Sequence, residues 1–164
     1  MRTLKAQALT AESFSPFGSY YDMENPSGVA LTGELHSFFP DKLSEAYHER
    51  LGFSPIVVKK PDSMVVTQAE HHYTSPELII PLNDDMIIHV SPASPDDYPC
   101  IEETRAFIVP KGTLVKINTA IWHLVPLPVN EEYLHAMIIL PETTYARDCP
   151  VITLKEEDCF TIIL

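Results

Sequence analysis

The sequence is short of glycine, of basic residues and of long apolar runs, and each shortage narrows what the chain can be. Its 164 residues include five glycines against fifteen prolines. Because proline is excluded from helix interiors and central strands, the chain must break into short elements joined by many turns. This composition favours an all-β sandwich or barrel. No apolar run approaches the ~20 residues that a membrane-spanning helix needs.

Basic residues are outnumbered by acidic ones, 11 against 23, and the formal net charge is −12. A chain of this charge repels phosphate backbones and anionic lipid surfaces, so we exclude nucleic acid and membrane as partners. An anionic small-molecule substrate would need a local basic pocket or a metal ion to overcome the overall field.

Cysteine is also scarce. The chain has three cysteines, Cys100, Cys149 and Cys159, which is an odd number, and none of them lie in C-x-x-C spacing. We therefore expect reduced thiols and a cytoplasmic protein. Residues 1–14 lack the apolar segment of a signal peptide, so none is expected. The length and the lack of a recognisable linker predict a single domain over residues 1–164.

The local patterns predict many short strands and two short helical segments near the N-terminus. We expect a helical turn over residues 9–14 with Thr10 as N-cap, a strand beginning at Tyr20 and Tyr21, and a helix over residues 41–51 closed by Gly52. Further strands are expected at residues 56–59, 64–68, 77–81, 86–90, 106–109, 114–118, 134–140, 151–153 and 160–164. Strands at this density, without helices between them, predict an antiparallel barrel or jelly roll.

Two segments place polar, metal-capable side chains in stretches that otherwise read as buried strand. The first runs from Glu70 to Glu77 and the second from Gly112 to His123. Their spacing resembles the two motifs of cupin barrels, G-x5-H-x-H-x3–4-E-x6-G and G-x5-P-x-G-x2-H. The corresponding positions here are Met64, Glu70, His72, Glu77 and Asp84, followed by Gly112, Asn118, Ala120 and His123.

The cupin resemblance implies a double-stranded β-helix and a divalent metal held by Glu70, His72, Glu77 and His123. Two imidazoles and two carboxylates suit Mn²⁺, Ni²⁺, Fe²⁺ or Zn²⁺. Residues 70 and 72 would share one face of a strand, with His71 opposite and exposed. Glu70 stands where the motif has histidine, and the alternative is a barrel whose interior polar groups bond one another without an ion.

A closer resemblance is to the ureidoglycolate lyase family, across the chain except roughly residues 22–55. It is carried by five stretches: residues 9–18 (LTAESFSPFG), residues 70–81 with E-H-H and E-L-I-I-P, Thr104-Arg105-Ala106-Phe107, Ile121-Trp122-His123 with Pro126, and the Asp-Cys pairs at 148–149 and 158–159. The chain departs from the family's pattern where Leu124 follows His123 and where Asn118 replaces a frequent histidine.

This resemblance implies elimination of urea from ureidoglycolate, which leaves glyoxylate. Glu70 would be a fourth ligand or the general base, and Arg105 or Lys116 would bind the substrate carboxylate, with Lys116 also a catalytic candidate. Asn118 and Trp122 complete the predicted substrate-binding set, although Trp122 also suits core packing. Two alternatives remain: a metal-dependent cupin of another activity, such as a sugar isomerase or dioxygenase, or a non-catalytic cupin that binds a small ligand. We expect a homodimer.

Overall fold

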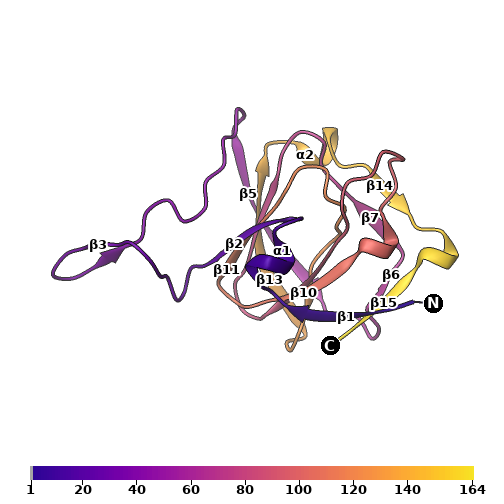
Figure 1. Cartoon of the computed structure of the whole chain (residues 1–164), viewed down its shortest axis with the longest axis horizontal. Coiled ribbons are helices and arrows are strands. Elements are labelled where there is room, and N and C mark those ends of the chain that lie inside the picture. Colours follow the sequence, from indigo (N-terminus) through magenta and orange to yellow (C-terminus); the bar gives the residue numbers. More distant parts are fainter. Residues whose placement is uncertain (1) are drawn as a thin grey trace.

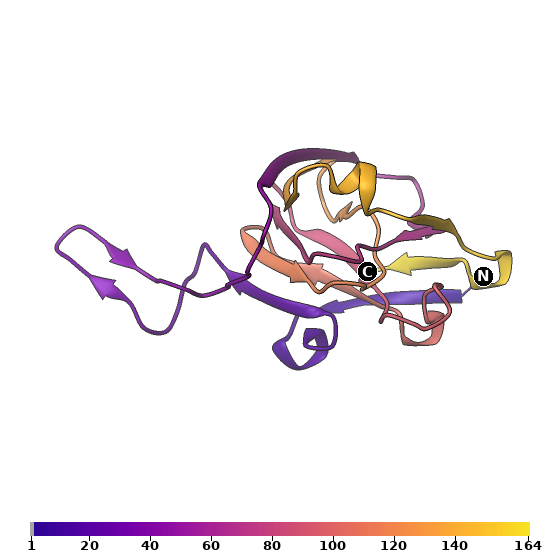
Figure 2. The ribbon, with the colours of Figure 1, turned by 90° about the horizontal axis from the view of Figure 1, so that it is seen from above.

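Two curled sheets form the body of the protein in the computed structural model, which describes residues 2–164 (Figures 1 and 2). The six-stranded sheet has the order β12-β9-β10-β1-β15-β6, and the five-stranded sheet has the order β2-β11-β8-β13-β5. Two further pairs, β14-β7 and β3-β4, complete the strands of the described chain. The expected all-β cupin barrel is therefore confirmed.

The strands are β1 (Arg2–Ala8), β2 (Gly18–Asp22), β3 (Leu31–Thr32), β4 (Ser37–Phe38), β5 (Leu51–Lys59), β6 (Val65–Val66), β7 (Gln68–Glu70), β8 (Glu77–Pro81), β9 (Met86–Val90), β10 (Arg105–Val109), β11 (Thr113–Ile117), β12 (Leu127–Pro128), β13 (Tyr133–Pro141), β14 (Val151–Thr153) and β15 (Phe160–Ile163). The helical segments are α1 (Ala11–Phe14), α2 (Thr144–Arg147) and the single 3₁₀ turns η1 (Ile101–Glu103) and η2 (Glu156–Asp158). Within residues 2–164 no helix has the length and hydropathy of a membrane span.

Strands β8, β9 and β14 coincide residue for residue with the predicted strands. The predicted strand at 64–68 is instead divided between β6 and β7. Strand β1 was not predicted, and it departs from the antiparallel pattern because it pairs in parallel with both β10 and β15.

The barrel holds two hydrophobic clusters on opposite faces of strand β9. Met86, Ile88 and Val90 belong to the larger cluster, which fills the space between the two sheets, whereas Ile87 belongs to a second cluster that also contains Trp122. Because successive strand residues point to opposite faces, a strand between two cores needs apolar side chains throughout. All five residues of β9 are buried, His89 among them.

The N-terminal helical turn is confirmed as α1, where the hydroxyl of Thr10 accepts a hydrogen bond from Ser13 N at 3.2 Å. The second short helix, α2, lies close to the C-terminus rather than the N-terminus. Its position was not predicted.

The predicted helix over residues 41–51 is wrong, because residues 41–50 form turns and bends before β5 begins at Leu51. Side chains of this segment make separate contacts with the barrel. Glu45 pairs with Lys116 at 3.0 Å, and the Tyr47 hydroxyl donates to Pro76 O at 3.1 Å. An isolated helix of this length is marginal in water, so separate tertiary contacts can outweigh its helical pattern.

Asp84, at the last position of the first motif, is a buried acceptor that ties two turns together. It accepts hydrogen bonds from the backbone N–H groups of Asp85, Asn130 and Glu131 and from the Asn130 amide. Burial raises the pKa of its carboxyl, but these donors outweigh burial and hold the pKa below its ordinary value.

We expect Asp84→Ala to lower the free energy of unfolding at neutral pH by about 1–3 kcal/mol, because it leaves buried N–H groups without an acceptor. A depressed folded-state pKa means that this stabilisation is present above the unfolded pKa of about 3.9 and is lost as the pH falls through the folded value. Urea unfolding from pH 7 down to about pH 3 measures it. Asp62→Ala is the exposed control, and a deficit that persists in acid would contradict this account.

Candidate functional site

The two motif segments meet through backbone hydrogen bonds at one end of the barrel. Glu70 N donates to His123 O at 2.7 Å, and His123 N donates to Glu70 O at 2.8 Å. Ala120 N donates to His72 O at 2.7 Å. These bonds fix the loop after β11 against the end of β7, so two stretches far apart in sequence face one another.

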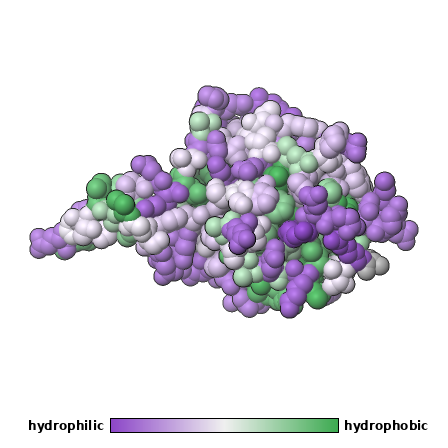
Figure 3. Space-filling view, viewed as in Figure 1, coloured by the Kyte–Doolittle hydropathy of each residue, from purple (hydrophilic) through white to green (hydrophobic). Residues whose placement is uncertain are grey.

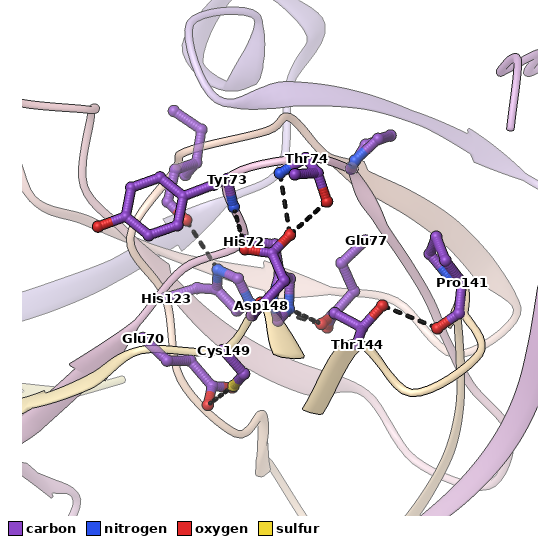
Figure 4. Close-up of polar contacts among 12 residues, drawn as sticks. Glu70, His72, Tyr73, Thr74, Glu77, His123, Pro141, Thr144, Asp148 and Cys149 are labelled. Atoms are coloured by element: carbon purple, nitrogen blue, oxygen red, sulfur yellow. Dashed lines mark hydrogen bonds and ion pairs between the residues drawn. The ribbon is translucent and has the colours of Figure 1, made fainter. Parts of the chain in front are cut away.

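His72, Glu77 and His123 converge inside the barrel (Figure 4). Their side chains are 2–5% exposed. His72 Nε2 lies 3.1 Å from Glu77 Oε2, and His123 Nε2 lies 3.5 Å from the same oxygen. One ligand atom from each residue lies within 4.8 Å of the others.

Backbone carbonyls set the orientation of both imidazole rings. His72 Nδ1 lies 2.7 Å from Asp148 O, and His123 Nδ1 lies 2.8 Å from Ile121 O. A carbonyl oxygen can only accept, so Nδ1 carries the proton in each ring. In the neutral ring, each Nε2 then presents a lone pair toward a carboxylate oxygen, which is also an acceptor. The centre of this group therefore calls for a proton or a cation.

The pKa values reflect that mutual attraction. Burial raises the pKa of Glu77, but the two histidines outweigh burial and lower it to about 2. Burial lowers the pKa of His123, but the Glu77 carboxylate, with a smaller contribution from Glu70, raises it above its ordinary value. The group therefore favours an ionised carboxylate surrounded by positive charge.

A divalent metal fits the donor atoms of this group. Two ligands at about 2.0–2.1 Å from one tetrahedral ion lie about 3.3–3.4 Å from each other, close to the separations of the histidine nitrogens from Glu77 Oε2. A metal-binding histidine commonly donates its second N–H to a carbonyl or carboxylate, as both rings do here. The geometry is thus suited to Mn²⁺, Fe²⁺, Ni²⁺ or Zn²⁺.

Glu70 lies beside this group without belonging to it. Its carboxylate accepts a hydrogen bond from the Cys149 thiol, with Sγ 3.1 Å from Oε2 (Figure 4). Burial, with the bond to and the charge of Glu70, raises the pKa of Cys149 to about 12 and keeps the thiol protonated. The group of three possible metal ligands among the described residues therefore does not include Glu70.

The segment of α2 and the residues after it covers the cluster, and sequence reasoning assigned it no role. The Tyr145 ring stands edge-on to His72, with the ring centroids 6.2 Å apart. Burial, followed by the charges of Glu77 and Glu70, raises the pKa of Tyr145 and keeps its phenol protonated. Asp148 fastens this segment, because its carboxylate accepts from Tyr73 N at 2.8 Å and Thr74 N at 2.9 Å.

The two predicted carboxylate-binding cations lie elsewhere. Lys116 pairs across the sheet with Leu78, whereas Glu77 pairs with Ile117, so Lys116 faces the outside of the barrel. Arg105 is exposed and donates to Thr104 O at 3.0 Å. Arg147, which the sequence did not single out, is exposed and pairs with Glu49 at 2.9 Å. It lines a cavity of about 180 Å³ together with Thr74 and with Asp148, whose backbone carbonyl contacts His72.

The remaining predicted residues divide between the surface and the second core. Asn118 is exposed in the loop after β11, where its N–H donates to Phe17 O. Trp122 is buried in the second cluster, with its ring centroid 4.2 Å from that of His71. The prediction that His71 is exposed is wrong. It follows the end of β7 and is buried against Trp122 and Tyr73, whereas His72 contacts Glu77.

A curled two-sheet barrel with an internal His/Glu/His group from its two motif segments defines this protein as a cupin. The sequence model of the ureidoglycolate lyase family matches residues 1–160, and the chain belongs to that family. No curated protein matches the chain.

Several solved structures resemble the fold. They include oxalate decarboxylase from Bacillus subtilis at pH 4.6, with 14% identity and a TM-score of 0.45, and a formate complex of oxalate decarboxylase from Lactobacillus farciminis, with 13% identity and a TM-score of 0.46. Each match covers 65% of this chain, and respectively 24% and 27% of the other chain. This chain therefore spans about a quarter of the length of those enzymes.

Ala120 has a backbone φ of +64° at the position where the cupin motif has glycine. A left-handed conformation costs a residue with a Cβ atom roughly 1–2 kcal/mol, and glycine is free of that cost. We expect Ala120→Gly to raise the free energy of unfolding by about 0.5–1 kcal/mol, after the greater chain entropy of glycine is subtracted. Denaturant unfolding checks this, with Ala46→Gly, in an exposed irregular segment of ordinary φ, as the control. Destabilisation by Ala120→Gly would contradict it.

Proposed function

We propose that this protein is a ureidoglycolate lyase that converts ureidoglycolate to glyoxylate and urea with a divalent metal held by His72, Glu77 and His123. The observation that carries the proposal is the buried triad with both imidazoles fixed to present Nε2 to Glu77, in a chain that belongs to the ureidoglycolate lyase family. The substrate would be a small anion. We retain the cytoplasmic location on the strength of the three unpaired cysteines.

A metal at this triad would act as a Lewis acid that lowers the pKa of the substrate hydroxyl and orients the substrate. Glu70 is the base of the proposed reaction and takes the proton of that hydroxyl. The Cys149 thiol, by donating to Glu70 Oε2, holds this carboxylate in place without ligating. As the hydroxyl becomes the aldehyde of glyoxylate, the C–N bond breaks and its electron pair leaves with the urea nitrogen.

The leaving nitrogen needs a proton, and Tyr145 is the donor that the structure offers. Its ring stands edge-on to His72, and the raised pKa of its phenol keeps the proton in place at neutral pH. The substrate carboxylate needs a cation. Arg147 shares a cavity with Asp148, whose carbonyl contacts His72, and would exchange its partner Glu49 for the substrate carboxylate. A guanidinium can bind a carboxylate through two parallel hydrogen bonds. We therefore place Arg147 ahead of Arg105 and Lys116 for this role.

The metal site is tested by loading the purified protein with Mn²⁺, Fe²⁺, Ni²⁺ or Zn²⁺ and measuring affinity by calorimetry. We expect His72→Ala to weaken binding at least about a hundredfold, since it removes one of three protein ligands. His71→Ala is the matched control, because His71 is the adjacent buried histidine but faces away from the triad. Equal losses in the two variants, or no binding by the unaltered protein, would contradict the metal site.

Activity is tested with ureidoglycolate under each metal and with a chelator, by following glyoxylate and urea separately. We expect both products in equal amounts, and we expect Glu70→Gln to lower kcat by about 10²–10⁴-fold as a lost general base. Cys100→Ala is the control for a general effect of sequence change, because Cys100 lies outside the triad.

No glyoxylate above the uncatalysed rate under any metal would overturn the lyase assignment, and release of ammonia in place of urea would indicate hydrolysis instead. In the same assay, Arg147→Ala should raise KM about tenfold or more, whereas Arg105→Ala should leave it near the unaltered value. A larger effect of Arg105→Ala than of Arg147→Ala would instead assign the binding of the substrate carboxylate to Arg105.

A further inference from the structure

A second cavity, separate from the triad, has a buried histidine in its wall. The cavity measures about 240 Å³ and is lined by residues from three segments, 71–73, 93–97 and 120–122. No residue of the triad lines it, and neither does Glu70. Its volume is below the ~300–1,000 Å³ of pockets for drug-sized ligands, so it suits a smaller molecule.

His71 is 3% exposed, and neither nitrogen of its ring has a hydrogen-bond partner within residues 2–164. Nε2 lies 3.4 Å from Asp97 Oδ1, which is an ion-pair distance without the geometry of a hydrogen bond. Nδ1 has no partner of either kind. Folded proteins pair almost all of their buried polar atoms. An unpaired imidazole in the wall of a cavity therefore points to a partner from outside the chain.

Two aromatic rings hold His71 in this position. The ring centroids of Tyr73 and Trp122 each lie 4.2 Å from that of His71. The Tyr73 hydroxyl donates to Asp97 Oδ1 at 2.7 Å, which fastens the loop after β9 to the segment after β7. The fold thus sets the imidazole and the carboxylate beside each other without a hydrogen bond between them.

The polar groups of this cavity are mostly acceptors. Asp97 Oδ2 bonds no group of the described chain, and the Ser94 hydroxyl uses its proton on Tyr98 O. At about pH 8 histidine is neutral, so one nitrogen of the His71 ring carries a proton and the other accepts. The described lining residues include no lysine or arginine. A ligand here should therefore bring N–H donors and a positive charge.

The surroundings of the cavity also favour a cation. Acidic residues outnumber basic ones by 23 to 11 in the chain, and hydrophilic residues cover much of the barrel on the face shown in Figure 3. A protein of this charge raises the local concentration of cations and repels anions. The small anion that we propose as the substrate is therefore poorly suited to this cavity.

A guanidinium group meets these requirements better than a metal ion or an ammonium. Its planar N–H groups point in several directions, so it can bond a carboxylate and an imidazole nitrogen at once. It also packs on aromatic rings, and Tyr73 is half-exposed at the cavity. A closed metal site takes about four ligands, whereas this cavity offers one imidazole and one carboxylate. We propose that the cavity binds a guanidinium group through Asp97 and His71.

Two sources would supply this group, a free small guanidine and an arginine side chain of another protein. Methylguanidinium represents the first, and arginine blocked at both backbone ends represents the second. Methylurea and blocked citrulline are the matched neutral probes, because each keeps the shape but replaces one charged nitrogen by oxygen. The tighter of the two cations identifies the source, and tight binding of either supports the guanidinium site.

The experiment follows the imidazole ¹⁵N signals of the full chain, labelled at histidine, at about pH 8 with a chelator that keeps metal from the triad. We expect the His71 signals to shift to saturation with methylguanidinium or blocked arginine, with a dissociation constant in the millimolar range or below. The signals of His72 and His123 should move little. Each neutral probe should bind at least about tenfold more weakly than its cation.

A pair of neighbouring aspartates supplies the matched variants. Asp97→Asn removes the charge while keeping the shape, and it should weaken binding of the cation at least about tenfold. Asp96→Asn is the control, because Asp96 is also exposed and does not line the cavity. Substitution at an exposed position leaves the core intact, and circular dichroism establishes that both variants are folded.

Four results would each overturn the proposal. They are an unmoved His71 signal with both cations, equal affinity for a cation and its neutral probe, equal losses in the two aspartate variants, and shifts confined to the histidines of the triad. None of them depends on the metal or on the reaction proposed above.

Discussion

The candidate site depends on two hydrogen bonds from imidazole Nδ1 atoms to backbone carbonyls. They hold His72 against Asp148 O and His123 against Ile121 O, so both rings turn Nε2 toward Glu77. Without them the rings could turn, and the triad would be three buried polar groups with no fixed centre. The carbonyls come from different parts of the chain, and the rest of the fold supplies the frame that keeps them in position.

That frame explains why the barrel has two cores. Strand β9 is buried on both faces, and the bridge between Ser91 and Trp122 continues it toward the loop that carries His123. The second cluster, with Trp122 inside it, therefore braces the back of this loop while His123 points into the barrel. Trp122 acts through packing in this arrangement. The adjacent histidines also point to different sides. His71 packs against Trp122 of the second cluster, and His72 contacts Glu77 inside the barrel.

The sequence predicted best where a residue's role follows from its spacing along one strand. Short apolar or alternating runs located β8 and β9, and motif spacing brought together His72, Glu77 and His123. It did worse where the decisive contact comes from a distant segment. Nothing local to residues 41–51 reveals that Glu45 and Tyr47 will contact the barrel. The alternation of side chains along β11 puts Lys116 on one face of the strand, but it does not tell which face of the sheet lies inside the barrel. No sequence pattern pointed to Tyr145 and Arg147, because α2 is a single turn and too short to show a periodicity. The position of α2 depends on the contacts of Asp148 with a distant segment.

The bond from His72 to Asp148 O joins positions 76 residues apart. Closing so long a loop carries an entropic cost that must be met before the contact contributes any stability. During synthesis the barrel strands of the first motif emerge long before Asp148 does. Ring orientation at His72 therefore forms late, and a nascent chain would not hold the finished triad until Asp148 had left the ribosome.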